Sequence, residues 1–229
     1  KKAFVDLVNS NIKSRGLISV LRNGVSDPMM NGKFQFFYNK PNTNSNKTDC
    51  DNYKQNIFKA TRQLKYSDKH NNTLDMVLSL NGFPLIVMEL KNQFTNQNVY
   101  NAIKQFKEDR NPKESMFEFN RRVLVYFAVD TDEVYMTTEL KGKNTYFLPF
   151  NKGNDRGKGN PPVEGKEKTS YLWEEILTKD SLLDIVKRFY FIEKDGTKDR
   201  RAIFPRFHQL DAVRKIVSDL KINKAGKNY

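Results

Sequence analysis

Asp75, Glu89 and Lys91 are the residues of this chain whose types and spacing are suited to catalysis. Glu89 and Lys91 stand two positions apart in the apolar run LIVMELK, and Asp75 lies in a second apolar run, TLDMVLSL. Residues two apart on a strand project from the same face. Charged side chains are seldom buried unless they are paired or functional. Two carboxylates and an amine in such surroundings indicate a site for a divalent cation, with Asp75 and Glu89 as its ligands.

The chemistry that this set predicts is hydrolysis of a phosphodiester bond. Carboxylate oxygens suit a hard cation such as Mg²⁺, which polarises a phosphoryl oxygen and lowers the pKa of a bound water. Lys91 would stabilise the charge that develops on the phosphate or orient the attacking water, and the Leu90 carbonyl is a further candidate ligand. The alternative is that Glu89 and Lys91 face solvent on a half-buried strand while Asp75 pairs with a lysine.

A hairpin must bring the two apolar runs together, and its turn decides whether the carboxylates meet. Asn81-Gly82 between the runs predicts that hairpin. A loop of three or five residues places Asp75 opposite Glu89, whereas a two-residue turn puts them on opposite faces. We expect the odd-numbered loop, with the two Cβ atoms about 4.5–5.5 Å apart.

The remaining patterns intermingle helices and strands, so the predicted class is α/β or α+β with a mixed sheet. The helices that we expect cover residues 3–15, 53–63, 95–110 with Thr95 as its cap, 169–178, 180–193 and 208–221. The expected strands cover 34–38, 73–80, 84–90, 122–129 and 132–138, with loops at 39–52 and 150–168 and a basic linker at 194–207. Trp173 is expected in the core between the late helices.

Composition narrows the class of protein. The chain has 229 residues and a formal charge of +13, and nucleic acid is the commonest acidic partner of a basic domain; the alternative is a basic protein with no polyanionic partner. Cys50 is the single cysteine, so no internal disulfide forms and a reducing cytoplasm is expected. The longest apolar run, residues 123–129, is too short to span a bilayer, and no signal-peptide pattern opens the chain. These features argue against a secreted disulfide scaffold, an integral membrane protein and a zinc–cysteine module.

At Asp75, Glu89 and Lys91 the sequence resembles the PD-(D/E)xK nuclease superfamily. More narrowly, it resembles the N-terminal nuclease domain of the restriction (R, motor) subunit of type I restriction-modification enzymes. The similarity runs over roughly residues 60–220, and its most specific phrases are MELKNQ, VYMTTELKGKNTYFLPFN and SYLWEEIL. The resemblance implies a restriction-endonuclease-like α/β fold, with a central mixed β-sheet flanked by helices.

The resemblance also assigns roles to residues. It implies that Asp75 and Glu89 bind Mg²⁺ and that Lys91 assists catalysis. Gln105 matches the first position of a QxxxY motif found in many members, but Asp109 stands where the tyrosine would be. A role for Gln105 near the active site or DNA is therefore set against that of an exposed helical residue. Three basic residues near the motif are candidate phosphate contacts, or else solvated charges: Arg62, Lys65 and Lys104.

The C-terminal phrase FPRFHQLDAVRKIV resembles the segment just before the first ATPase motif of the motor. Gln209 would match a glutamine that reads the adenine of ATP. The phosphate-binding pattern GxxxxGK[ST] is absent, so ATP is expected as a cofactor of the full-length protein only. We expect a nuclease domain at 1–193, in which 150–168 is a flexible loop, and a linker with the first motor helix at 194–229. The family usually carries a further N-terminal helix with a glutamate near the site, so this chain is expected to be a fragment.

The sequence thus predicts the Mg²⁺-dependent endonuclease domain of a type I restriction enzyme R subunit. It would cut DNA without intrinsic sequence specificity, coupled in the full protein to ATP-driven translocation. The implied partners are double-stranded DNA and the methyltransferase and specificity subunits of the same system, with no membrane. The alternatives are an inactive DNA-binding or subunit-docking module, a stand-alone repair-type Mg²⁺ nuclease, and a structural basic protein in which the three side chains do not converge.

Overall fold

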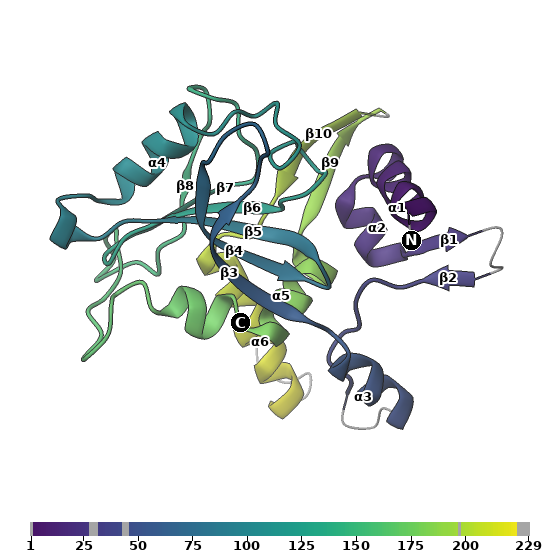
Figure 1. Ribbon diagram of the computed structural model, residues 1–229. Coiled ribbons are helices and arrows are strands. Elements are labelled where there is room, and N and C mark those ends of the chain that lie inside the picture. Colours follow the sequence, from purple (N-terminus) through teal and green to yellow (C-terminus); the bar gives the residue numbers. More distant parts are fainter. Residues whose placement is uncertain (1, 28–31, 43–45, 197, 224–229) are drawn as a thin grey trace.

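A computed structural model of the chain describes residues 2–27, 32–42, 46–196 and 198–223 (Figure 1). Its helices are α1 (Lys2–Arg15), α2 (Leu17–Asn23), α3 (Lys47–Lys54), α4 (Val99–Glu108), α5 (Lys179–Asp184) and α6 (Phe207–Asn223), with short turns η1 (Gln93–Thr95), η2 (Leu172–Ile176) and η3 (Ile185–Phe189). Its strands are β1 (Val25–Asp27), β2 (Gly32–Phe34), β3 (Phe58–Lys65), β4 (Thr73–Leu80), β5 (Phe83–Leu90), β6 (Val125–Val129), β7 (Val134–Thr137), β8 (Leu148–Pro149), β9 (Phe191–Asp195) and β10 (Lys198–Ile203).

A six-stranded mixed sheet in the order β3-β4-β5-β6-β7-β8 forms the centre of the fold. Its neighbouring strands pair antiparallel except β5 and β6, which are parallel. A parallel pair needs a crossover connection, and helix α4 lies within that connection. Figure 1 shows α4 on one side of the sheet and helices α5 and α6 on the other. The predicted α/β class with a central mixed sheet flanked by helices is therefore confirmed.

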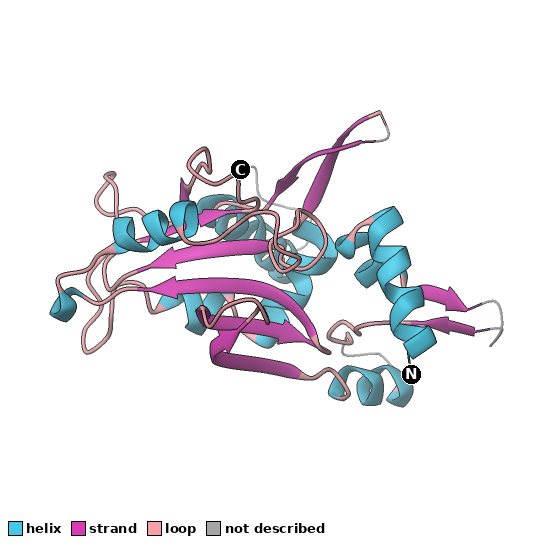
Figure 2. Cartoon of the chain, turned by 45° about the horizontal axis from the view of Figure 1, so that its top comes forward, coloured by secondary structure: helices cyan, strands magenta, loops and turns pink. Residues whose placement is uncertain are grey.

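Two apolar clusters pack on the two faces of this sheet, whose strands are drawn in magenta in Figure 2. The smaller cluster, under α4, includes Val77, Val87, Ala102, Phe106 and Tyr126. The larger cluster lies on the opposite face and gathers side chains from α1, α2, η2, α5, η3 and α6. Since both faces are covered, any charged side chain in the middle of β5 is removed from water and needs a partner.

The hairpin of β4 and β5 has the expected register near Asp75 and Glu89, but its turn differs from the expected one. Leu80 pairs with Phe83, so the turn has two residues, and both have positive φ, 49° at Asn81 and 88° at Gly82. The prediction of an odd-numbered loop is therefore wrong, because this Asn-Gly pair adopts the mirror-image turn that suits hairpin twist. A β-bulge then leaves Leu85 unpaired, since Ser79 faces Pro84 and Leu78 faces Ile86.

The bulge restores the pairing that the active site needs. Beyond it Val77 faces Val87 and Met76 faces Met88, so the next residues along the two strands are Asp75 and Glu89. The consecutive residues Leu85 and Ile86 both belong to the larger cluster, as expected where an extra residue interrupts the alternation of a strand. The demand for apolar burial on that face therefore accounts for the bulge.

Replacing Asn81 by glycine should lower the free energy of unfolding by about 1–3 kcal/mol. Glycine tolerates the positive φ, but the Asn81 side chain also accepts a hydrogen bond from Ile57 N–H at 2.7 Å and donates one to the Phe36 carbonyl at 2.6 Å. Urea denaturation followed by circular dichroism measures the change. Gly82→Ala, which loses no such contacts and whose Cβ would meet no atom within 4 Å, isolates the backbone effect and should cost about 1–2 kcal/mol from φ alone. If Asn81→Gly is as stable as the wild type, the two hydrogen bonds of the Asn81 side chain do not stabilise the fold.

Several expected elements differ from the structure. Residues 53–63 form the end of α3 and most of the edge strand β3 rather than one helix, because β4 supplies a partner for strand hydrogen bonds. Beyond Phe34 the aromatic run at 34–38 is not a strand; the Asn56 side chain holds its end by donating to Tyr38 O at 2.6 Å and accepting from Tyr38 N at 3.0 Å.

Other differences lie beyond the hairpin. Helix α4 begins four residues later than expected, with Asn98 rather than Thr95 as its cap. Within the expected basic linker, β10 forms a hairpin with β9, and Ala202 and Phe204 are buried in the larger cluster. Apolar anchors at these two positions explain why the segment packs instead of running free. The proposed division into 1–193 and 194–229 stays a prediction.

Candidate active site

Asp75 and Glu89 meet at the ends of β4 and β5 on the face covered by α4. The backbone N–H of Leu90 donates to Oδ2 of Asp75 at 2.9 Å, and the Gln63 side chain donates to its Oδ1 at 3.0 Å. Gln63 in turn accepts from the hydroxyl of Thr73 at 2.6 Å. Asp75 is thus hydrogen-bonded to β5 through one carboxylate oxygen and to the edge strand β3 through the other.

Glu89 is fully buried and pairs with a residue that sequence reasoning did not single out. The guanidinium of Arg110, just beyond α4, donates to Oε1 of Glu89 from Nε at 2.9 Å and from a terminal nitrogen at 2.6 Å. Arg110 also donates to the Thr73 carbonyl at 2.8 Å, and its side chain is only 3% exposed. Because a buried carboxylate needs a counter-charge, the glutamate in the run LIVMELK was itself the signal that a distant cation exists.

The other carboxylate oxygen of Glu89 is unsatisfied. Oε2 is buried and has no hydrogen-bond partner among the described residues. Burial raises the pKa of Glu89 to about 7, and the nearby charge of Asp75 adds to the rise, although the Arg110 guanidinium acts in the opposite direction. Two carboxyl groups close enough to repel one another favour either a shared proton or a cation between them.

Lys91 and Gln105 complete the cluster. The amine of Lys91 donates to Oε1 of Gln105 on α4 at 2.6 Å. The Lys91 backbone N–H donates to the Val129 carbonyl at 2.8 Å, which continues the β5–β6 pairing past the end of β5. Since α4 carries Gln105 and the crossover fixes α4 above this strand, the amine is held on the same face as Glu89. The structure therefore places on one face of the sheet the four residues that the sequence singled out as catalytic.

The donor set fits a hard cation. Asp75 and the unsatisfied Oε2 of Glu89 are hard oxygen donors of the kind that Mg²⁺ prefers, and Mg²⁺ usually retains several waters besides one or two carboxylates. Among the residues that the structure describes, no group of three or more His, Cys, Asp or Glu side chains is arranged to hold a metal ion. Further ligands would therefore be water, a substrate phosphate and the Leu90 carbonyl.

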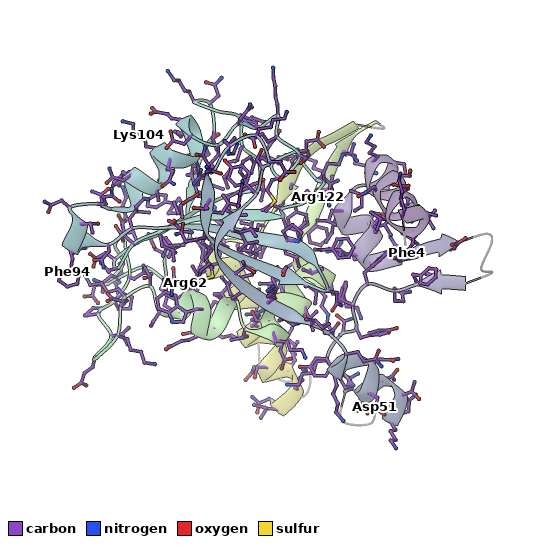
Figure 3. The ribbon with its side chains drawn as sticks, in the orientation of Figure 1. Phe4, Asp51, Arg62, Phe94, Lys104 and Arg122 are labelled. Carbon is purple, nitrogen blue, oxygen red and sulfur yellow. The ribbon has the colours of Figure 1, made fainter. Side chains whose placement is uncertain are left out.

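The candidate DNA contacts are spread over the surface. Arg62 and Lys65 are exposed on the edge strand β3, and Arg62 pairs with Met76 rather than with Asp75. Lys104 is exposed on α4 and forms an ion pair with Glu108 at 3.8 Å (Figure 3). Asp109, at the tyrosine position of the motif, is exposed and is the C-terminal cap of α4. These three basic residues stay predictions as phosphate contacts.

Gln209 lies away from this cluster, near the start of α6. Its Oε1 accepts from the backbone N–H of Arg206 at 3.0 Å. With Arg206, Glu139 and Arg201 it lines a cavity of about 590 Å³.

No helix among the described residues has both the length and the apolar character that a membrane span requires.

Comparison with known proteins identifies the family. Residues 9–145 match the family model described as the N terminus of type I restriction enzyme R proteins. Because that match covers more than half of the chain, the chain belongs to this family, the N-terminal domain of type I restriction enzyme R subunits.

Two relatives agree with this assignment. The chain is 25% identical, over its whole length, to a Methanocaldococcus jannaschii protein provisionally named the MjaVIIIP type I restriction enzyme endonuclease subunit, and the match covers 21% of that protein. It is 23% identical over 74% of its length to the HindI type I restriction enzyme endonuclease subunit of Haemophilus influenzae, covering 16% of that relative. The chain thus spans about a fifth or less of the length of these relatives.

Proposed function

We propose that this chain is the Mg²⁺-dependent nuclease domain of a type I restriction enzyme R subunit, with the PD-(D/E)xK type of active site. The observation that carries the proposal is the convergence of Asp75, the unsatisfied Oε2 of Glu89 and the Lys91 amine on one face of the β4–β5 hairpin. The family assignment and the endonuclease names of both relatives support it.

Each residue has a part in cleavage. Asp75 and Glu89 would hold the cation, which, when bound, polarises the scissile phosphate and activates a water. Lys91, oriented by Gln105, binds a non-bridging phosphate oxygen and stabilises the charge that grows on it. Arg110 holds Glu89 in place and offsets its charge, so that a carboxylate survives in a buried position.

The wider system is part of the same proposal and rests on the resemblance of the sequence to type I restriction enzyme R subunits. The R subunit would couple this domain to ATP-driven translocation, with Gln209 contacting adenine in the full-length protein. Cleavage would not read sequence, because recognition of the DNA site would belong to the specificity subunit. Its partners would be double-stranded DNA and the methyltransferase and specificity subunits, in the cytoplasm.

Asp75→Asn should abolish Mg²⁺-dependent nicking of plasmid DNA. The substitution keeps the size of the side chain but removes the charge that a hard cation requires. Conversion of supercoiled to open-circular plasmid measures it, with EDTA added to the wild type as the metal-removal arm. Asp51→Asn, an exposed carboxylate on α3 (Figure 3), is the matched control and should cut normally.

The outcome also separates the alternatives. DNA binding without cleavage in the wild type would favour the inactive DNA-binding or docking module. Nicking that continues in EDTA or in Asp75→Asn would contradict the proposed site itself.

A further inference from the structure

The sole tryptophan of the chain, Trp173, lies half exposed beside the candidate active site. The expectation that it is a core residue is wrong: its neighbours Leu172 and Ile176 in η2 are buried at 1% and 3% exposed, whereas Trp173 is 49% exposed. Within the described part of the chain its indole N–H donates no hydrogen bond. A large amphipathic ring left facing water is typical of a binding contact.

Trp173 shares a cavity with the catalytic strand. A cavity of about 280 Å³ is lined by Leu90 and Lys91 at the end of β5, by Asp130 just after β6, and by Glu167 and Trp173. The indole therefore shares this hollow with the strand end that carries Lys91, whose amine is bonded to Gln105 on the α4 side. Ligand sites in sheets of this kind commonly form outside the carboxyl ends of neighbouring parallel strands.

The segment that leads into Trp173 is hydrogen-bonded to the end of the sheet. The hydroxyl of Thr169, which is buried, donates to the Asp130 carbonyl at 2.7 Å. Asp130 also anchors α4, because its Oδ2 accepts from Val99 N–H at 2.8 Å. The segment before Trp173 and the helix that carries Gln105 are therefore tied to the same residue, which fixes the indole relative to Lys91.

The charged residues of the cavity favour a neutral occupant beside Trp173. Glu167 is exposed and lines the cavity, while the Lys91 amine is directed to Gln105. The Asp130 carboxylate is already satisfied by the backbone N–H groups of Val99, Asp132 and Glu133. A phosphate inside the cavity would be repelled by the Glu167 carboxylate, whereas a neutral flat group with N–H donors would not be.

We propose that Trp173 stacks on an unpaired nucleobase next to the phosphate bound by Lys91. Leu90, 42% exposed, supplies a further apolar side chain to the lining of the cavity. This assignment rests on the proposed nuclease function and adds to it a preference for a base that has left the duplex stack. Stacking on an aromatic ring tolerates any base, so the contact positions the strand without reading sequence.

The single tryptophan makes the test direct. On the Asp75→Asn background, which keeps the DNA uncut, an oligothymidine of about 12 nucleotides should quench tryptophan emission, and a duplex of equal length should quench it less. Anisotropy of the labelled oligonucleotide gives the affinity. Trp173→Ala should weaken single-strand binding by about 10- to 100-fold, whereas Trp173→Phe should retain most of the affinity. Tyr146→Ala, which removes an exposed ring outside this cavity, is the matched control.

The outcomes distinguish this inference from the function on which it rests. Binding of the oligonucleotide with unchanged emission, or with full affinity in a folded Trp173→Ala variant, overturns the stacking role and leaves the nuclease proposal intact. Equal quenching by duplex and single strand overturns the unpaired base. Absence of DNA binding by the wild type contradicts both proposals.

Discussion

Replacing Lys91 by alanine should slow DNA cleavage by about two to three orders of magnitude, the loss typical when one preorganised donor to a developing oxyanion is removed. The Lys91 amine lies at the carboxyl end of β5, bonded to Gln105 at 2.6 Å, so it is placed before substrate arrives. Steady-state plasmid nicking in Mg²⁺ measures the rate, and thermal unfolding checks the fold. The melting temperature should change little, because Lys91 is only half-buried.

Two further variants serve as comparisons in this experiment. Lys59→Ala removes an exposed lysine from the edge strand β3 and should cleave as the wild type does. Gln105→Ala leaves the amine in place but without its partner, so it should cause a smaller loss than Lys91→Ala. A Lys91→Ala protein that nicks at the wild-type rate would remove Lys91 from the reaction.

Replacing Arg110 by alanine should lower the free energy of unfolding by about 3–5 kcal/mol near pH 8, because removing one partner of a buried ion pair leaves the other charge uncompensated. Both side chains are almost fully buried, at 3% and 0% exposed, so solvent screens the pair little. Urea denaturation followed by circular dichroism measures the loss. Glu89→Leu combined with Arg110→Met should recover much of it, since replacing both partners of a buried ion pair by apolar residues is often close to neutral.

The loss of stability caused by Arg110→Ala should depend on pH. The pKa of Glu89 is raised from 4.5 to about 7, so this group favours folding fully below pH 4.5, and that contribution is lost as pH rises through about 7. Removing Arg110 takes away an attraction that lowers the pKa of Glu89. The substitution therefore destabilises the protein mainly when the Glu89 carboxyl group is ionised. The destabilisation should therefore be larger at pH 8 than at pH 5. An equal loss at both values would assign it to missing packing instead of charge.

Local sequence patterns were sufficient to predict the hairpin and its charged residues. Two apolar runs on either side of the Asn-Gly pair indicated β4 and β5, and a glutamate and lysine inside one of these runs indicated a site. The predicted meeting of Asp75 and Glu89 was correct, but for a reason that the pattern did not contain. The turn has two residues, and the bulge at Leu85 supplies the missing step in register.

Other parts of the site required contacts between distant segments. Arg110 lies in a polar stretch with no pattern of its own, and only the folded chain places it against Glu89. Trp173 looked like a core residue by its type, yet Leu172 and Ile176 occupy the buried positions of its turn. Which face of a short helical turn is buried depends on what packs against it, and short windows of sequence do not encode that.

The sequence by itself determined the residue types of the site, their strands and the basic charge suited to nucleic acid. The tertiary structure alone decided the register that joins the carboxylates, the cation that accompanies Glu89 and the exposure of the tryptophan beside Lys91. The physical reason is that strand periodicity is a local property of the chain. A bulge, a buried ion pair and a cavity wall are instead set by the joint packing of both faces of the sheet, where burial and charge compensation are satisfied together.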